Sequence, residues 1–360
     1  MSLKVGIVGL PNVGKSTLFS ALTKKEVDIN NYPFCTIAPN VGIAQVEDER
    51  LNKLHCLFPE SKEIPAIVEF VDIAGLVKNA HKGEGLGNQF LTHIRNVDAI
   101  LEVVRAFADE NIKHVENEVN PLRDIGTIKS ELILSDLEQI ARRKVYIGKM
   151  RRSWGKEKEI AEAEWAILEI LENILDKGQW LHPLPKIPEK LIPLAKELIK
   201  NFSLLSAKPI LHIINTKGGS DKAEKEFYGL NESECLVVDV KIEKELAEMS
   251  KKDLAELQLT SQLNNIVRHS YRLLGLITFY TSGEKETRAW TIKKGINAGE
   301  AASVIHSDFE KFFIRANTVS LNNLLSAGSW KNARVKGLLR QEGKDYLIKE
   351  GDVVEFVIGK

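Results

Sequence analysis

The chain has 360 residues, 43% hydrophobic and 28% charged, a composition typical of a globular protein with two or three domains. Lys+Arg and Asp+Glu are both 50, so a net charge of zero excludes a chain-wide attraction for nucleic acid or membranes. The cysteines, Cys35, Cys56 and Cys235, form neither a disulfide framework nor a metal-ligand spacing, which is typical of a reducing compartment. No apolar run is long enough to cross a bilayer, and we expect a cytoplasmic monomer that does not bind membranes.

Short apolar runs alternate with helical patterns on both sides of a central insertion. The runs are 3–8, 67–71, 99–104, 209–214 and 236–240. Continuous apolar runs of this length are typical of parallel strands that are buried on both faces. We therefore expect an α/β domain, with a mostly parallel sheet and helices on both faces, formed by residues 1–126 and 207–275.

The inserted segment, residues 127–206, has the pattern of two amphipathic helices. Apolar residues recur at steps of three, four and seven on both sides of a break at residues 153–155, which predicts an antiparallel helical hairpin. Its tip, residues 142–158, holds eight Lys/Arg and one acidic residue, a net charge of +7. A projecting basic tip with Tyr146 and Trp154 is suited to contact with a phosphate backbone. The alternative is an ordinary solvated helix face.

The last 85 residues, 276–360, have a third pattern. Runs at 276–281, 287–292 and 353–358 read as strands, and 299–309 reads as a short helix, which predicts a small mixed β domain. Its 13 basic and 10 acidic side chains give a weak excess of +3, so charge alone does not indicate RNA binding there.

Residues 9–16 read Gly-Leu-Pro-Asn-Val-Gly-Lys-Ser and match the phosphate-loop (P-loop) pattern G-x-x-x-x-G-K-[ST]. Glycines let such a loop wrap around a phosphate with its N–H groups pointing inward. We expect Lys15 to act as a catalytic residue on the β- and γ-phosphates, and the Ser16 hydroxyl to ligate Mg²⁺. The expected nucleotide contacts in this loop are Asn12, Val13, Gly14, Lys15, Ser16 and Thr17. The sequence therefore predicts binding and hydrolysis of a nucleoside triphosphate.

A second motif, Asp72-Ile73-Ala74-Gly75, ends the run at 67–71. In a P-loop domain, Asp72 can hold Mg²⁺ through water, and Gly75 can offer its N–H to the γ-phosphate as a catalytic group. The alternative is an ordinary turn at the end of a strand.

The segment 31–40 offers a third possible ligand for the metal. Thr36 can add its hydroxyl to Mg²⁺ while the γ-phosphate is present, which would make the segment a sensor of the nucleotide state. The alternative is a surface loop fixed by its prolines.

Three motifs together resemble the Obg-related GTPases, namely G-L-P-N-V-G-K-S, N-Y-P-F-C-T-x-x-P-N-V-G and D-I-A-G-L. The stretch K-G-E-G-L-G-N-Q-F-L then resembles the Obg-like ATPase (YchF) subfamily. The resemblance covers the whole chain and implies a P-loop G domain, an inserted helical hairpin and a C-terminal TGS domain with a β-grasp fold. It also implies hydrolysis of ATP or GTP with a preference for ATP, and association with ribosomes or RNA.

The resemblance implies roles for single residues as well. Leu76 stands where Ras-like proteins place the glutamine that orients water, so intrinsic hydrolysis is expected to be slow. His114 matches a histidine thought to assist catalysis in this family, and a solvated loop histidine is the alternative. Asn12 matches an asparagine that holds a potassium ion in some relatives, so K⁺ joins Mg²⁺ as an expected cofactor.

The base-recognition segment is Asn215-Thr216-Lys217-Gly218, in which Asn215 and Thr216 are the expected nucleotide contacts. Guanine-specific relatives use N-K-x-D, whose Asp accepts two hydrogen bonds from guanine, but here the nearest carboxylate, Asp221, is displaced by three residues. Each charged hydrogen bond contributes about 1.5–3 kcal/mol, so most of the preference for guanine is lost. Gly218 also departs from the N-x-x-E usual in the Obg-like ATPases, which leaves promiscuous binding of ATP and GTP open.

Two functions fit these observations. The first is a slow nucleotide hydrolase, an ATPase with a GTPase as the alternative, whose nucleotide state controls docking to the ribosome. The second, motivated by Leu76, is a nucleotide-gated ribosome or RNA adaptor in which hydrolysis is incidental.

Overall fold

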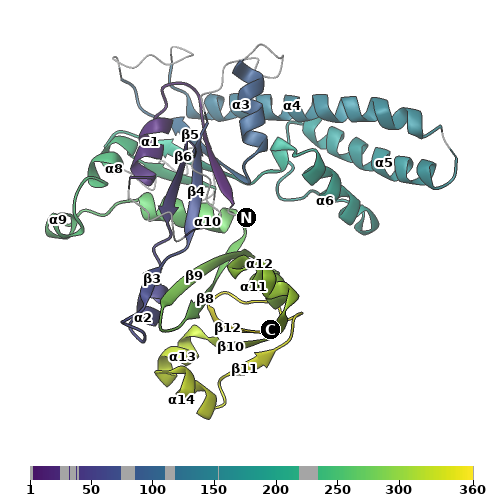
Figure 1. The fold of residues 1–360 in the computed structure, drawn as a ribbon. Helices are drawn as coiled ribbons and strands as arrows, with labels where there is room; N and C mark the ends of the chain where they lie inside the picture. The colour runs from purple at the N-terminus through teal and green to yellow at the C-terminus, as the bar shows by residue number, and fades with distance from the viewer. Residues whose placement is uncertain are drawn as a thin grey trace. The chain divides into compact units, whose positions relative to one another are not determined.

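The structure is a computed structural model that describes residues 3–24, 32, 38, 40–73, 86–109, 118–152, 154–218 and 234–359 (Figure 1). The chain divides into two compact units. Unit 1 comprises Met1–Leu3, Leu22–Glu69 and Gln262–Lys360, and unit 2 comprises Lys4–Ala21 and Phe70–Ser261. No helix among the described residues combines the length and the apolar character needed to span a bilayer.

Parallel strands of unit 2 form most of the first sheet, as the continuous apolar runs predict; residues 41–45 and 67–69 of the same sheet belong to unit 1. The sheet has the strand order β2-β4-β1-β5-β6-β7. Its strands are β2 (Val41–Gln45), β4 (Ile67–Asp72), β1 (Lys4–Val8), β5 (Ala99–Arg105), β6 (Ile210–Asn215) and β7 (Cys235–Val238). β1 pairs with β5, β5 with β6, and β6 with β7, each in parallel. Every residue of β5 is buried, as expected of a strand that is covered on both faces.

Helices follow the strands along the chain. α1 (Lys15–Leu22) begins after β1, α3 (Leu86–Arg95) precedes β5, and α8 (Val240–Leu246) begins after β7. The remaining helices of this unit outside the hairpin are η3 (Glu189–Leu191), α6 (Ile192–Asn201), η4 (Leu205–Ala207) and α9 (Lys251–Glu256).

The predicted hairpin is present, formed by α4 (Pro121–Met150) and α5 (Lys156–Asp176), which lie side by side (Figure 1). α4 begins at Pro121, before the expected boundary at 127, because Asn120 caps its N-terminus and proline is favoured in the first turn. The buried side chains along the hairpin form one cluster with those of α6. This cluster contains Ile133, Ile140, Ile167, Leu168, Leu171, Leu175, Leu181, Ile187, Ala195, Leu198 and Leu204.

A buried carboxylate, Asp136, ties α4 to the chain that returns from the hairpin. It accepts hydrogen bonds from the backbone N–H groups of Leu205 (3.0 Å) and Ser206 (2.8 Å), and from the Ser206 hydroxyl (2.6 Å). Burial raises the pKa of Asp136, while the hydrogen bonds from Ser206 and Leu205 oppose this rise. The carboxylate therefore satisfies three donors that water does not reach.

We expect Asp136→Ala to lower the free energy of unfolding by about 2–4 kcal/mol, because it leaves buried donors without an acceptor. Urea denaturation followed by circular dichroism measures the change. Asp176→Ala, at the exposed end of α5, is the matched control and should stay within about 0.5 kcal/mol of the unmodified chain. Equal unfolding midpoints for the two variants would contradict this role of Asp136.

Unit 1 contains the second sheet, which is mixed. Its strand order is β11-β10-β12-β8-β9-β3. The strands are β11 (Arg340–Glu342), β10 (Phe313–Ser320), β12 (Asp352–Ile358), β8 (Leu276–Ser282), β9 (Glu286–Lys293) and β3 (Lys62–Ile64). Its helices are α2 (Glu49–His55), α10 (Leu263–Leu273), α11 (Ala298–Ile305), α12 (Ser307–Lys311), α13 (Leu321–Ala327) and α14 (Trp330–Val335). Buried apolar side chains, among them Phe279, Trp290 and Ile348, form the core beneath this sheet.

Two sequence-based expectations for this sheet need correction. The single helix predicted over 299–309 is two helices, because His306 adopts an extended backbone (φ −156°, ψ 135°) and its Nδ1 accepts from the Asp308 N–H to cap α12. The edge strand β3 comes from residues 62–64, far from the C-terminal segment in the sequence, and it pairs in parallel with β9. The three-residue length of β3 gave no apolar pattern to detect.

Candidate nucleotide-binding site

The P-loop connects β1 to α1 in a conformation that its glycines allow. Gly9 has φ 153°, and a Cβ there would lie 2.4 Å from the backbone oxygen of Val103. Gly14 has φ 105°, and a Cβ there would lie 2.7 Å from Nδ2 of Asn215. Neither position therefore has room for a side chain, which is why the motif requires glycine at both. Asn12 also has a positive φ, 62°, in the left-handed region that asparagine tolerates.

Lys15 and Ser16, which begin α1, have their side chains held at the loop. The Lys15 ammonium donates to the backbone oxygen of Leu10 (2.8 Å), and the residue as a whole is 8% exposed. Burial lowers the pKa of Lys15, and the negative charge of Asp72 opposes this effect. The Ser16 hydroxyl donates to Oδ2 of Asp72 at 2.9 Å. The structure thus brings together the lysine, hydroxyl and carboxylate of two motifs that are far apart in the sequence.

The oxygen atoms of Ser16 and Asp72 fit the demands of Mg²⁺. This ion prefers oxygen ligands and usually binds one or two protein oxygens, with phosphate and water oxygens completing the octahedron. Among the described residues there is no cluster of three or more His, Cys, Asp or Glu arranged for a metal ion. The hydroxyl and carboxylate are therefore suited to a metal that arrives with a phosphate, and less suited to a metal held by the protein alone.

Asn215, at the end of β6, joins the P-loop to the base-recognition segment. Its Nδ2 donates to the backbone oxygen of Val13 (2.9 Å), and its Oδ1 accepts from the N–H of Val240 (3.1 Å). The next residue, Thr216, donates its N–H to the backbone oxygen of Val238 (3.0 Å). Both are buried, so this part of the predicted site is held between β6, β7 and the P-loop, and contact of Asn215 with a base stays a prediction.

The structure also shows a carboxylate that the sequence analysis missed at this segment. Gly218 has φ 96°, and its N–H donates to Oδ2 of Asp239 at 2.8 Å. Oδ1 of Asp239 accepts from the N–H groups of Lys241 and Ile242, both at 3.1 Å, and so caps α8. An Asp before a helical pattern is a recognisable cap in a sequence, but its contact with Gly218 depends on the pairing of β6 with β7.

A second missed residue, Arg105, lies at the end of β5 next to Asn215 of β6 in the strand register. Its side chain is 1% exposed, and its Nε donates to the backbone oxygen of Phe107 at 2.9 Å. The guanidinium also lies over the Phe107 ring, 4.8 Å from the centroid. Arg105 therefore fixes the start of the segment that leads to His114. An arginine at the end of an apolar strand pattern is the signal by which the sequence could have indicated this residue.

Several predicted positions lie outside the described residues, and their roles stay predictions. These are the catalytic candidates Gly75 and His114, the metal ligand Thr36, the apolar Leu76 and the displaced Asp221.

The hairpin base is bonded to α3, the helix that follows the Asp72-x-x-Gly75 motif in the chain. Arg95, the last residue of α3, donates to the backbone oxygens of Phe202 (3.3 Å) and Ser203 (3.0 Å) and to the Ser135 hydroxyl (2.9 Å). Its guanidinium also lies 3.7 Å from the Asp136 carboxylate. One side chain thus joins the end of α3 to both the outgoing and the returning segments of the hairpin.

The basic tip, residues 142–158, is less positive than the sequence count of +7 suggests. Arg143 pairs with Glu164 (2.6 Å) and Lys144 with Glu172 (2.5 Å), two acids of α5 that lie outside the counted range. A third cation, Lys158, lies 4.0 Å from Glu162, also outside the counted range. Acids of α5 therefore pair with three of the eight cations. Trp154, by contrast, is 90% exposed, so an aromatic ring accompanies the remaining charge at the tip.

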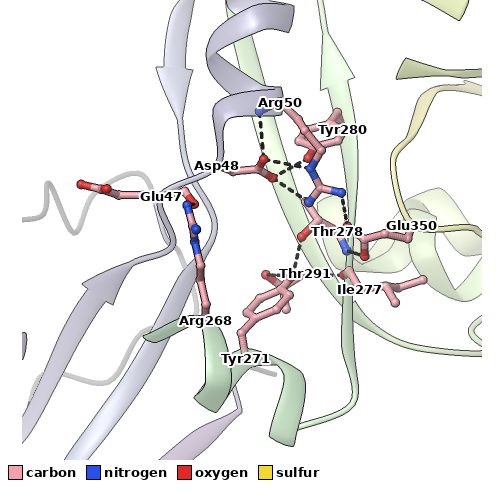
Figure 2. A network of polar contacts seen from close by, with 10 residues as sticks. All are labelled: Glu47, Asp48, Arg50, Arg268, Tyr271, Ile277, Thr278, Tyr280, Thr291 and Glu350. Atoms are coloured by element: carbon pink, nitrogen blue, oxygen red, sulfur yellow. Dashed lines mark hydrogen bonds and ion pairs between the residues drawn. The ribbon is translucent and has the colours of Figure 1, made fainter. Parts of the chain in front are cut away.

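Unit 1 contains a polar cavity of about 560 Å³ beside an ion-paired network (Figure 2). Arg50 donates to Asp48 (2.9 Å) and Glu350 (2.5 Å), and the Tyr280 hydroxyl donates to Asp48 (2.5 Å). Burial would raise the pKa of Asp48, but the hydrogen bonds from Arg50 and Tyr280 hold it below its usual value. None of the described residues that line this cavity belongs to the P-loop or the base-recognition segment.

Because the folded-state pKa of Asp48 is depressed, its contribution to stability is present at neutral pH and is lost as the pH falls below about 4. We expect Asp48→Asn to have a lower melting temperature than the unmodified chain at about pH 7. At about pH 3 the difference in melting temperature between the two proteins should be smaller. Asp345→Asn, at an exposed position of the same unit, should show neither effect. A difference that is the same at both pH values would contradict the prediction.

Comparison with protein families matches two separate parts of the chain. A family model described as a 50S ribosome-binding GTPase matches residues 4–135, and the model YchF-GTPase_C, described as a protein of unknown function, matches residues 276–358. The two matches lie on the P-loop segment and on the strands of the C-terminal sheet.

Individual proteins are similar over their full length. The chain is 46% identical to the ribosome-binding ATPase YchF of Bacillus subtilis strain 168, covering 99% of both chains. It is 42% identical to the protein of the same name from Escherichia coli O157:H7, again over 99% of both. The solved structure of the Schizosaccharomyces pombe YchF GTPase superposes with a TM-score of 0.86 at 34% identity, covering 99% of this chain and 98% of that one. These similarities confirm the predicted P-loop fold.

Proposed function

The chain belongs to the YchF family, and from this premise we propose that it is a ribosome-binding ATPase whose triphosphate lies on the P-loop. The observation that carries the proposal is the convergence of Lys15, Ser16 and Asp72. The ammonium of Lys15 and the hydroxyl of Ser16 at the P-loop, with the carboxylate of Asp72 at the end of β4, form the set that phosphoryl transfer requires. Asn12, Val13, Gly14 and Thr17 complete the proposed phosphate contacts, with Asn215 and Thr216 towards the base.

In this proposal the Ser16 hydroxyl and the Asp72 carboxylate would hold Mg²⁺, which would supply positive charge to the phosphates. Lys15 has a different task, because it stabilises the β- and γ-phosphates directly. The contact of its ammonium with the Leu10 oxygen holds the side chain beside the loop, where little of its surface is exposed. We also propose Thr36 as a metal ligand and K⁺ near Asn12, with Gly75 and His114 assisting the reaction.

We expect Lys15→Ala to reduce steady-state ATP hydrolysis by at least about 100-fold, because it removes a charge that acts on the transferred phosphoryl group. Phosphate release from purified protein with ATP and with GTP measures the rates. Lys53→Ala, at an exposed position of α2, is the control and should hydrolyse like the unmodified chain. Hydrolysis at equal rates by Lys15→Ala and the control would remove the enzymatic function.

The ribosome is the proposed macromolecular partner, and the basic tip is the proposed surface for ribosomal RNA. The relatives are named ribosome-binding, and the tip combines cations that are free of the α5 acids with the exposed ring of Trp154. Lysine and arginine bind phosphates through counterion release, and an exposed aromatic ring can stack on an unpaired base. Docking through this surface should therefore weaken as the salt concentration rises.

One observation favours the second candidate function, a nucleotide-gated adaptor. Arg95 connects α3, which follows the predicted γ-phosphate sensor in the chain, to Ser135 on α4 and to the returning segment at 202–203. A displacement of α3 would be passed to the base of a helix of 30 residues and enlarged at its tip. Gating of this kind needs a change of nucleotide state, whether or not rapid turnover accompanies it.

We expect Arg95→Ala to make ribosome co-sedimentation independent of nucleotide, while hydrolysis in the absence of ribosomes changes by less than about threefold. ATP, ADP and a non-hydrolysable analogue are compared. Arg95→Lys keeps the charge but loses the forked donors of the guanidinium, so its ribosome binding should also be independent of nucleotide. Lys200→Ala, at an exposed position of α6, is the control and should bind ribosomes in a nucleotide-dependent way. Nucleotide-dependent binding by Arg95→Ala would reject the coupling; equal binding of the unmodified chain in all three states would reject gating.

A further inference from the structure

The base-recognition segment has a glycine at the position where guanine-specific relatives have a carboxylate, yet the structure shows a carboxylate beside it. Asp239 follows β7, whereas Gly218 follows β6, and the parallel pairing of these strands brings the two residues together. The Gly218 N–H donates to Oδ2 of Asp239 at 2.8 Å. The positive φ of Gly218, 96°, belongs to a region that an acidic residue rarely adopts. The backbone conformation at position 218 therefore favours glycine over an acidic residue, and the carboxylate near this position comes from Asp239.

This carboxylate lies next to the phosphate-binding part of the site. Asn215, three residues before Gly218, bonds to Val13 of the P-loop and also accepts from the N–H of Val240, the residue after Asp239. Asp239 itself is only partly buried. A purine whose triphosphate occupied the P-loop would lie towards these segments, as the base-recognition motif indicates.

The number of hydrogen bonds that Asp239 already makes limits what it can do. A carboxylate has about four acceptor positions. Three of them are used by backbone N–H groups, those of Gly218, Lys241 and Ile242. Among the described residues no other donor bonds to this carboxylate, so one position is left for a ligand. Guanine offers two neighbouring donors, N1–H and its amino group, and needs two acceptors; the exocyclic amino group of adenine can be satisfied by one.

We propose that Asp239 is the residue that reads the base, and that it favours adenine by accepting one hydrogen bond from the 6-amino group. The inference rests on the proposed function, since it concerns the base of the nucleotide on the P-loop. It accounts for a preference for ATP in a chain whose segment after Asn215 has no acidic side chain at the third position. A residue that only capped α8 would affect folding and would leave the choice of base unchanged.

The test compares affinities for ATP and for purine riboside triphosphate, which lacks the 6-amino group, with GTP as a third ligand. Isothermal titration with Mg²⁺ measures all three. The unmodified chain should bind ATP about tenfold or more tightly than purine riboside triphosphate, as one hydrogen bond to a charged group implies. In Asp239→Ser the ratio should fall towards one. Serine can still cap α8, so the variant removes the carboxylate and keeps the helix.

Asp239→Asn is the second variant, because it preserves the size of the side chain and one acceptor oxygen for the cap. The same fall in the ratio is expected, with the melting temperature close to that of the unmodified chain. An unchanged affinity ratio in both variants would overturn the assignment of Asp239, and so would an equal loss of affinity for all three nucleotides. Neither result would contradict the proposed ATPase function. Failure of the unmodified chain to bind any triphosphate would overturn the proposed function as well.

Discussion

The amide side chain of Asn215 is the contact on which the arrangement of the site depends. It bonds to the backbone of Val13 in the P-loop and accepts from Val240 at the start of α8, so the phosphate loop and the ends of β6 and β7 form one unit. The absence of a side chain on Gly14 is what allows this approach, since a Cβ would lie 2.7 Å from the amide nitrogen. The segments proposed to bind the phosphates and the base are therefore connected through one side chain.

At the hairpin base, too, a few polar side chains connect long helices. Asp136 satisfies three donors of the returning segment, and Arg95 approaches the same carboxylate from α3. Both side chains make their contacts in an environment that largely excludes water, where a lost partner costs more than a lost surface ion pair. The apolar cluster of α4, α5 and α6 stabilises the hairpin, and these polar contacts determine where its base is attached.

The sequence predicted those features that depend on local pattern. The P-loop motif, each apolar strand and the break between α4 and α5 are each a continuous stretch of sequence. Each was found within a few residues of the expected position. Features that depend on pairing between distant segments were missed, namely the contact of Asp239 with Gly218 and the ion pairs that partly neutralise the basic tip. The P-loop motif predicted nucleotide hydrolysis, and the family resemblance added the preference for ATP and the association with ribosomes.

The strand β3 carries a practical consequence for anyone dividing the protein into parts. A fragment beginning at the family boundary near residue 276 would lack Lys62–Ile64, and with it the parallel partner of β9. The unpaired amide groups along β9 would then form an open edge of the kind that recruits other chains. The hydroxyl of Thr287, which bonds to Ser61 in the intact chain, would also lose its neighbour. Such a truncation is thus prone to self-association, and a covalently linked copy of residues 61–64 is the remedy that the topology suggests.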